Sequence, residues 1–238
     1  MSELDYGIQM PEALSWTLNR KEIERYLGYH GHEPEAQVAR VVSRAIEDMR
    51  QHARPRSLWQ LFPLETDGQD RFRIADMTLA SRSLGRNLKG CDFVVLFAAT
   101  IGVEADLFIR RSSIRSSLLG AVYQAVGASL IEGYCNAVNG KIARKAKATG
   151  YYCRPRFSPG YGDVPLGMQK DWFRLLPITK KLGIELTDSC LMIPSKSVTA
   201  LIGLSRKAEP CMLSGCESCT LSGTCAYSRI REKGEDGR

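Results

Sequence analysis

The sequence predicts an α+β fold, in which long helices lie beside a twisted sheet of mixed or antiparallel strands. Strand-like segments come both before and after the long helical segments, without the regular alternation that a doubly wound parallel sheet requires. Of the 238 residues, 44% are hydrophobic and 25% are charged. This is an ordinary globular composition, and a chain of this length can bury a substantial core.

Apolar periodicity places the helices. Residues 11–29 are expected to form an N-terminal helical segment, and residues 34–52 an amphipathic helix with apolar side chains at intervals of three and four. Pro34 suits the first turn of that second helix. Residues 116–148 predict a long helix with a basic C-terminal end, which fits the helix dipole. A short amphipathic helix is expected around Trp172.

Short apolar runs and turn residues place the strands. The run at 93–99 has the length and the β-branched and aromatic content of a buried strand, and Thr100–Gly102 then leads towards another helix. A polar turn at 66–69 separates two earlier strands, and two later runs predict a pair of strands around a break at 194–196. The remaining predicted strands cover residues 58–64, 71–79, 190–193 and 198–204.

Charge and terminal sequence narrow the class of protein. The N-terminus lacks a basic start leading into an apolar run, and no stretch reaches the roughly 18 apolar residues that a membrane helix needs, so we expect a cytoplasmic protein without a membrane partner. The formal charge is +7, but basic residues are spread along the chain and mixed with acids. This pattern disfavours nucleic acid as a partner and predicts a basic surface suited to an acidic one.

Eight cysteines without a secretory signal argue against a disulfide framework, because a reducing cytoplasm keeps thiols free. Four of them cluster near the C-terminus with the spacing CxxxxCxxCxxxxxC. Thiolates at such short range can close on one metal centre, either tetrahedral zinc or an iron–sulfur cluster, and the spacing alone does not decide between them. The predicted ligands are Cys211, Cys216, Cys219 and Cys225.

The segment with the most chemical information is residues 154–163, which read RPRFSPGYGD. Its arginines can grip a carboxylate in two parallel hydrogen bonds. Its glycines allow a ligand to approach the backbone closely, and an aromatic ring lies next to them. These features suit a ligand that carries an amino-acid group, whereas the alternative interpretation is a plain proline and glycine turn.

The run from Arg156 to Tyr161 resembles the arginine, three residues, glycine, tyrosine motif with which the activation domain of cobalamin-dependent methionine synthase binds S-adenosylmethionine. A second stretch, 183–194 followed by Ser197 and Val198, resembles a downstream motif of the same family. The resemblance extends over about residues 85–204. The chain departs from the family after Tyr161 and at 201–202, where leucine and isoleucine replace an aromatic pair, which points to a differently built adenine pocket.

The resemblance implies that Arg156 holds the carboxylate of S-adenosylmethionine, while Gly160 and Tyr161 line its adenosyl or sulfonium end. A tyrosine face beside a sulfonium is favourable as a cation–π contact. Ser158, inside the motif, is a further candidate contact. The amino group of the ligand needs an acid, for which Glu132 and Asp163 are the two candidates, with a solvated or capping acid as the alternative for each.

The implied activity is that of an enzyme or enzyme component: reductive methylation of an inactivated corrinoid protein with S-adenosylmethionine. Methyl transfer needs in-line positioning and no proton transfer, so we predict no catalytic side chain. The three histidines, at 30, 32 and 52, lie in no Asp-x-His-x-x-Gly context. The cobalamin is therefore expected on a partner protein or methyltransferase domain, on which this chain acts in trans.

Reactivation also consumes an electron, which methionine synthase takes from a flavodoxin-type donor. The cysteine cluster is not part of the methionine synthase domain. Our hypothesis is that a [4Fe–4S] cluster there supplies or relays the electron, from a flavodoxin- or ferredoxin-type donor, with structural zinc as the alternative.

Three parts of the chain follow from this interpretation: an N-terminal portion at 1–84, a binding core at 85–204 and a cysteine-rich knuckle with a charged tail at 205–238. Two other functions remain open at this point. One is a zinc-knuckle binding module for nucleic acid or an acidic protein, and the other is a corrinoid-protein chaperone that keeps the fold without turnover.

Overall fold

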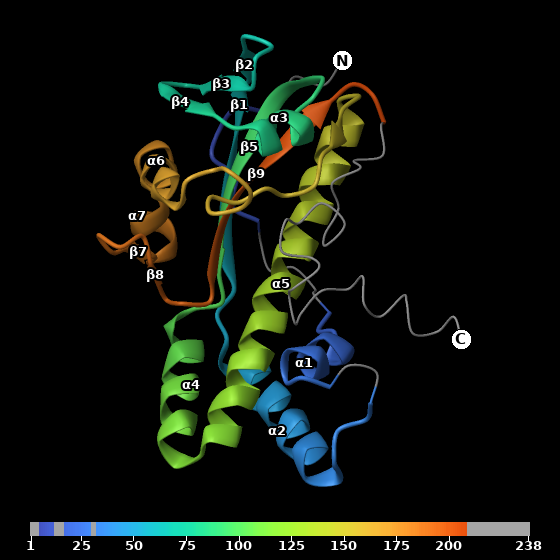
Figure 1. Cartoon of the computed structure of the whole chain (residues 1–238), viewed down its shortest axis with the longest axis vertical. Helices are drawn as coiled ribbons and strands as arrows, with labels where there is room; N and C mark the ends of the chain where they lie inside the picture. The colour runs from blue at the N-terminus through green and yellow to red at the C-terminus, as the bar shows by residue number, and fades with distance from the viewer. Residues whose placement is uncertain (1–4, 12–16, 30–31, 209–238) are drawn as a thin grey trace.

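A computed structural model describes residues 5–11, 17–29 and 32–208 (Figure 1). Its helices are α1 (Arg20–Tyr26), α2 (Ala36–His52), α3 (Arg82–Asn87), α4 (Val103–Arg115), α5 (Ser117–Ala148), the 3-10 helix η1 (Leu166–Met168), α6 (Gln169–Leu175) and α7 (Ile178–Leu182). Its strands are β1 (Arg56–Pro63), β2 (Glu65–Thr66), β3 (Arg71–Ile74), β4 (Met77–Ala80), β5 (Cys91–Thr100), β6 (Tyr152–Cys153), β7 (Glu185–Leu186), β8 (Met192–Ile193) and β9 (Ser197–Ser205).

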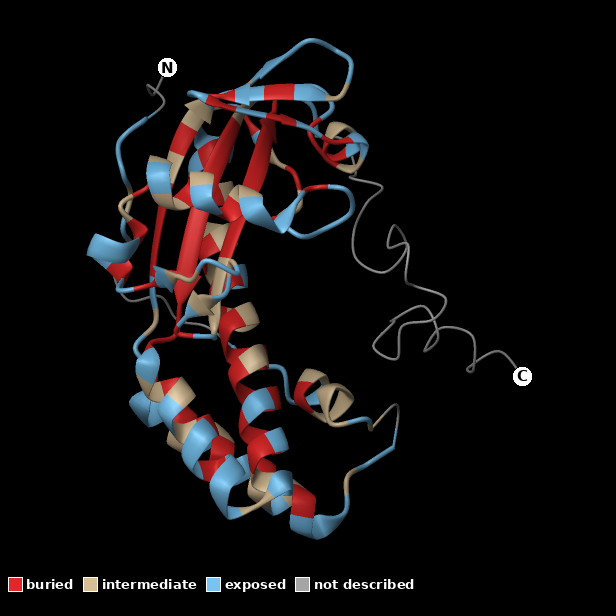
Figure 2. Cartoon of the chain, turned by 60° about the vertical axis from the view of Figure 1, so that its left-hand side comes forward, coloured by how far each residue is buried: buried red, intermediate tan, exposed pale blue. Residues whose placement is uncertain are grey.

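The main sheet has the order β1-β5-β9-β6, and every neighbouring pair in it is antiparallel. Strands β5 and β9 form its centre, and both are almost entirely buried, as the red strands in Figure 2 show. A central strand covered on both faces reads as a continuous apolar run, which is why 93–99 gave so clear a signal. The predicted α+β fold with an antiparallel sheet is confirmed.

Each face of the sheet packs against its own set of elements. Alternate residues of β5, such as Val95 and Phe97, face the core under α5, where α1 and α2 also pack. Their neighbours, such as Val94 and Leu96, face a second core formed with α3, α6, α7 and the β3–β4 hairpin. Helix α5 extends past the end of the sheet, where α2 and α4 pack against it (Figure 1).

Several predicted elements differ in detail. Helix α2 begins at Ala36 with Glu35 as its N-cap, so Pro34 precedes the helix and does not lie in its first turn. The strand predicted at 71–79 is a hairpin, because the chain turns at Ala75, whose φ is 53°. The last two apolar runs do form strands, but they lie in different sheets: β8 pairs with β7, whereas β9 pairs with β5 and β6.

The described part of the chain has no helix that is both long and apolar enough to cross a membrane. The boundary expected between residues 84 and 85 falls inside α3, and the one expected after residue 204 falls at the end of β9.

The N-terminal segment approaches α5 very closely. A Cβ added at Gly133 would lie 2.4 Å from the carbonyl oxygen of Thr17, which is far shorter than a van der Waals contact. Ser129, one helical turn earlier, donates a hydrogen bond from Oγ to the carbonyl oxygen of Asn19 at 3.2 Å. Glycine at 133 therefore lets the segment lie directly against the helix.

Substitution of two glycines on α5 tests this contact. We expect Gly133→Ala to lower the free energy of unfolding by about 1–3 kcal/mol, because the methyl group displaces the Thr17 carbonyl. The matched control is Gly140→Ala, whose Cβ would meet only the end of Arg144 at 3.6 Å. That change should raise the free energy of unfolding by about 0.5–1 kcal/mol through helix propensity. Urea denaturation measures both, and equal effects would contradict the close packing.

Candidate functional site

An extra residue after β6 turns Arg156 towards α5. Cys153 pairs with Leu204 and Phe157 with Leu201, so four steps along this segment match three along β9. One extra residue of this kind shifts the alternation of side chains, as in a β-bulge. Phe157 consequently packs in the core beneath α3 and α6, and Arg156 extends from the other face of the sheet edge to α5.

Arg156 binds two side chains on one face of α5. Its Nη2 donates to Glu132 Oε2 and to Asn136 Oδ1, both at 2.9 Å. The two acceptors are four residues apart, so they lie on the same side of the helix. The buried thiol of Cys135 lies beside this group, and burial raises its pKa to about 12, with Arg156 opposing the shift. The thiol is therefore uncharged, and it lies next to the ion pair.

The structure thus brings together two of the residues predicted from sequence, Arg156 and Glu132. The side chain of Arg156 is 18% exposed and that of Glu132 is 42% exposed. An ion pair so close to solvent contributes only about 0–1 kcal/mol to stability. A ligand with a carboxylate and an ammonium group can exchange with such a pair, because each of its charges replaces one partner. Asn136 was missed, although its spacing of four from Glu132 on a helix is visible in the sequence.

The remainder of the loop folds as two consecutive turns. The amide of Tyr161 donates to the carbonyl of Ser158 at 3.1 Å, and that of Val164 donates to the carbonyl of Tyr161 at 3.0 Å. Gly160 has a φ of +88°, which favours glycine, and its amide donates to the Val164 carbonyl at 2.9 Å. The Tyr161 side chain is 65% exposed, with its ring edge-on to Phe157 at 6.3 Å.

Asp163 anchors the end of this loop to α3. Its carboxylate accepts hydrogen bonds from Ser81 Oγ at 2.5 Å and from the amides of Arg82 and Ser83 at 2.8 and 3.2 Å. These bonds, that from Ser81 above all, hold the pKa of Asp163 well below its ordinary value of 3.8. The two amides belong to the first turn of α3, where N–H groups have no partner within the helix, and the Ser81 side chain accepts from the next amide, that of Leu84. Asp163 thus has the capping role, and Glu132 is the better placed acid for a ligand.

The two positions at which leucine and isoleucine replace the aromatic pair of the resembled family lie in the core. Leu201 and Ile202 are 1% and 0% exposed, and as neighbours on β9 they face opposite sides of the sheet. Their side chains fill the two cores on either side of the sheet. The replacement of aromatic residues at these positions therefore changes packing in the sheet.

A polar cavity of about 430 Å³ lies next to the Arg156 group, between α5 and the segment that enters α1. Glu132 and Asn136 line it, and both also bind Arg156. Asn19 and Glu22 line the opposite wall, and the sequence gave no signal for either as a site residue.

Comparison with known families identifies the family to which this chain belongs. The sequence model described as "Vitamin B12 dependent methionine synthase, activation domain" matches residues 85–217, more than half of the chain. The chain belongs to this family. The matched residues include α5, the motif loop and β9, which together form the Arg156 group.

The fold of this activation-domain family member is also that of a solved relative. A crystal structure of the MetH reactivation domain bound to AdoHcy aligns with a TM-score of 0.59 at 17% identity, covering 86% of this chain and 80% of that one. Its alignment therefore includes part of the N-terminal region that the family match does not reach. No curated protein sequence matches this chain.

The predicted metal ligands, Cys211, Cys216, Cys219 and Cys225, lie outside the described residues. Within residues 5–11, 17–29 and 32–208, no group of three or more histidine, cysteine, aspartate or glutamate side chains is arranged to hold a metal ion. Of the histidines, His52 is exposed, with Nδ1 2.8 Å from the Asp48 carbonyl and its ring against Phe108.

Replacing Asp163 tests its capping role. Asp163→Ala removes the acceptor of two α3 amides and should lower the free energy of unfolding by about 0.5–2 kcal/mol, whereas Asp163→Asn keeps an acceptor oxygen and most of that stability. Since the pKa of Asp163 is lowered on folding, the contribution of the carboxylate is present above about pH 4 and is lost as pH falls towards the native pKa. Thermal unfolding of the three proteins between pH 3 and 7 measures this, and identical melting curves would exclude the cap.

Proposed function

We propose that this chain binds S-adenosylmethionine and uses its methyl group to return an inactivated corrinoid protein to the methylated state, acting on that partner in trans. The observation that carries the proposal is the Arg156–Glu132 pair beside the motif loop. Family membership supports the same activity. The solved relative, whose crystal contains AdoHcy, supports the choice of ligand.

The ligand is held by exchange of charges. The carboxylate of S-adenosylmethionine takes the place of Glu132 on the Arg156 guanidinium, and its ammonium takes the place of the guanidinium on Glu132. Asn136 remains an acceptor for the guanidinium. An arginine fork binds a carboxylate in two parallel bonds, so this exchange gains one hydrogen bond over the single Nη2 contact with Glu132.

The loop is held at both ends before the ligand binds. Phe157 exchanges two backbone hydrogen bonds with Leu201 at its start, and Asp163 caps α3 at its end. Little conformational entropy is then lost on binding. In this proposal the exposed ring of Tyr161 lies beside the sulfonium, a contact that contributes about 0.5–2 kcal/mol depending on desolvation. Ser158 and Gly160 form the turn that presents this ring.

The reaction needs no acid or base from this chain. An electron from a flavodoxin- or ferredoxin-type donor reduces the partner's Co(II) corrinoid to Co(I). The electron pair on Co(I) attacks the methyl carbon, the C–S bond breaks, and the sulfur keeps the bonding pair as the neutral thioether of S-adenosylhomocysteine. No proton moves, so the work of this chain is to align the C–S bond with the approaching cobalt.

Calorimetry with S-adenosylmethionine tests the site. Arg156→Ala should weaken binding about 10- to 100-fold, because hydrogen bonds between charged groups are lost. Arg174→Ala is the matched control, since Arg174 also forms ion pairs, with Asp76 and Asp171, but lies in α6 on the opposite face of the sheet. Its affinity should equal that of the unchanged protein.

The same proteins then separate reactivation from simple binding. With a Co(II) corrinoid protein, a low-potential reductant and S-adenosylmethionine, the unchanged chain and Arg174→Ala should give the methylcobalamin spectrum, and Arg156→Ala should not. Equal ligand affinity in all three proteins would contradict the proposed site. Tight binding without methyl transfer to any corrinoid partner would favour the chaperone function.

We further propose that the four C-terminal cysteines hold a metal centre, and we favour [4Fe–4S] over zinc because reactivation consumes an electron. When present, a cluster would add one-electron chemistry to this chain. Protein purified without oxygen should be brown and contain stoichiometric iron and sulfide, and Cys216→Ser with Cys219→Ser should remove both. A colourless protein with stoichiometric zinc would assign the cysteines a structural role.

A further inference from the structure

An apolar cavity of about 250 Å³ lies between the main sheet and the C-terminal part of α5. Its apolar lining comes from three neighbouring strands and the helix, through Trp59, Leu61, Val95, Leu204 and Ile142. Small-molecule sites usually measure about 300–1,000 Å³ and are mostly apolar, with a few polar groups that orient the ligand. The apolar cavity is slightly smaller than this, so it suits a metabolite with a short apolar side chain.

Three side chains form a chain of hydrogen bonds at the mouth of the apolar cavity. Lys145 donates from Nζ to Gln9 Oε1 at 2.7 Å, and Gln9 donates from Nε2 to Asp5 Oδ2. All three line the cavity; Lys145 and Asp5 are exposed and Gln9 is half-buried, whereas Trp59 is only 4% exposed. The mouth therefore carries one cation and one anion, and an uncharged amide joins them.

Both charged groups have contacts that do not involve the Gln9 side chain. The Lys145 ammonium lies 6.0 Å from the centre of the Trp59 ring, within the range of a cation–π contact. The amide of Gly7 donates to Asp5 Oδ1 at 2.9 Å. The backbone of Gln9 exchanges hydrogen bonds of 2.8 and 3.0 Å with Trp59 on β1. Each charge thus keeps one contact when the Gln9 side chain turns away.

The Gln9 carboxamide presents the same hydrogen-bonding pattern as the head group of an α-amino acid. Its oxygen accepts from a cation and its nitrogen donates to an anion. In a free amino acid the carboxylate accepts and the ammonium donates, and both are charged, so their bonds to Lys145 and Asp5 are stronger than those of an amide. A ligand with a carboxylate alone would satisfy Lys145 but would leave Asp5 without the donor that Gln9 supplied.

We propose that the apolar cavity binds a free α-amino acid with an apolar side chain, such as L-leucine, L-methionine or L-phenylalanine. The carboxylate takes the place of Gln9 Oε1 on Lys145, and the ammonium takes the place of Gln9 Nε2 on Asp5. The side chain enters the apolar space beside Trp59. The inference does not depend on the proposed function.

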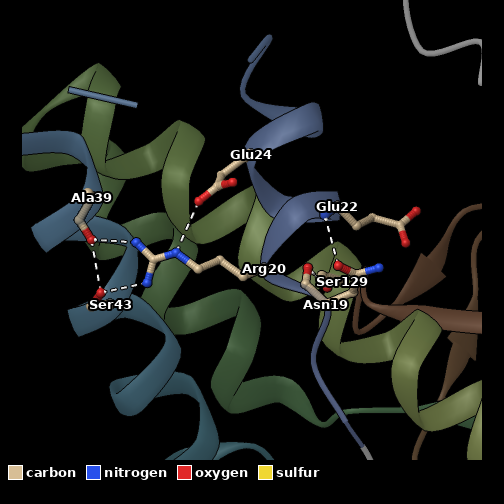
Figure 3. Close-up of polar contacts among 7 residues, drawn as sticks. All are labelled: Asn19, Arg20, Glu22, Glu24, Ala39, Ser43 and Ser129. Carbon is tan, nitrogen blue, oxygen red and sulfur yellow. Dashed lines mark hydrogen bonds and ion pairs between the residues drawn. The ribbon is translucent and has the colours of Figure 1, made fainter. Parts of the chain in front are cut away.

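The apolar cavity is separate from the Arg156 group. It shares no lining residue with the polar cavity beside that group. The N-terminal segment contacts α5 next to each of them: the Asn19 carbonyl accepts from Ser129 (Figure 3), and Gln9 accepts from Lys145. These two contacts are about 24 Å apart along the helix. An amino acid in the apolar cavity therefore leaves the contacts of Arg156 unchanged.

Calorimetry with L-leucine and three analogues tests the ligand class. Leucinamide lacks the carboxylate and 4-methylpentanoate lacks the ammonium, so each should bind at least 10-fold more weakly than L-leucine. L-Serine keeps the head group without the apolar side chain, and it should also bind at least 10-fold more weakly. Binding of leucinamide as tight as that of L-leucine would indicate the N-terminal residue of a peptide as the ligand and would overturn the proposal.

Variants at the mouth should change L-leucine affinity in opposite directions. Lys145→Gln and Asp5→Asn should each weaken binding at least 10-fold, because a charged partner is lost. Gln9→Ala should strengthen binding about 3- to 10-fold, because the ligand no longer competes with the Gln9 amide. Lys147→Gln is the matched control: Lys147 is a cation in the last turn of α5 but does not line the cavity, so this change should leave the affinity as it was.

Three results would overturn the proposal. The first is that neither the unchanged chain nor Gln9→Ala binds any of the three apolar amino acids at millimolar concentration. The second is that L-leucine binds with the same affinity to the unchanged chain, Lys145→Gln and Asp5→Asn. The third is that Arg156→Ala abolishes L-leucine binding while Lys145→Gln does not weaken it, which would place the amino acid at the Arg156 group.

Discussion

The candidate site depends on the direction in which one arginine leaves the sheet edge. Four steps from Cys153 to Phe157 match three along β9, and this extra residue lets Phe157 enter one core while Arg156 extends to α5 on the other side. Without the shift, the alternation of a regular strand would place the guanidinium on the other face of the sheet. The ion pair with Glu132, the contact with Asn136 and the link to the adjoining cavity all follow from that placement.

The same architecture separates rigid from exchangeable contacts. Hydrogen bonds that fix the loop are made by the backbone of Phe157, by the turns through Gly160 and by Asp163 on α3. The contacts that a ligand has to replace are side-chain contacts near solvent, in which the Glu132 carboxylate is 42% exposed. Replacing these contacts costs little free energy, whereas moving the loop would break several backbone and capping hydrogen bonds at once. A ligand can therefore exchange with the ion pair while the loop keeps its shape.

The sequence predicted the fold class because the strongest patterns belong to elements buried on one or both sides, such as β5 and the long helix α5. It failed where geometry depends on a single backbone residue: the turn at Ala75 divides a strand into a hairpin, and Pro34 precedes a helix that it was expected to begin. Of the site, the motif loop and Glu132 were found from residue types. Asn19 and Glu22, on the opposite wall of the adjoining cavity, gave no signal because they are more than a hundred residues from Arg156 in sequence and come near α5 only in the folded chain, where Thr17 packs on Gly133 and Asn19 bonds to Ser129.

The proposed function asks one chain both to hold a methyl donor and to present its methyl group to a partner protein. The amino-acid end of the proposed ligand is charged, and in the proposed function it exchanges with the Arg156–Glu132 ion pair beside the polar cavity. The proposed function also requires the methyl group to remain accessible, because a corrinoid on another protein would have to approach along the C–S bond. Tyr161, the residue proposed to lie beside the sulfonium, is among the most exposed large side chains of the described residues. In the proposed function, binding free energy from the charged end of the ligand thus positions a methyl group that stays accessible to the partner.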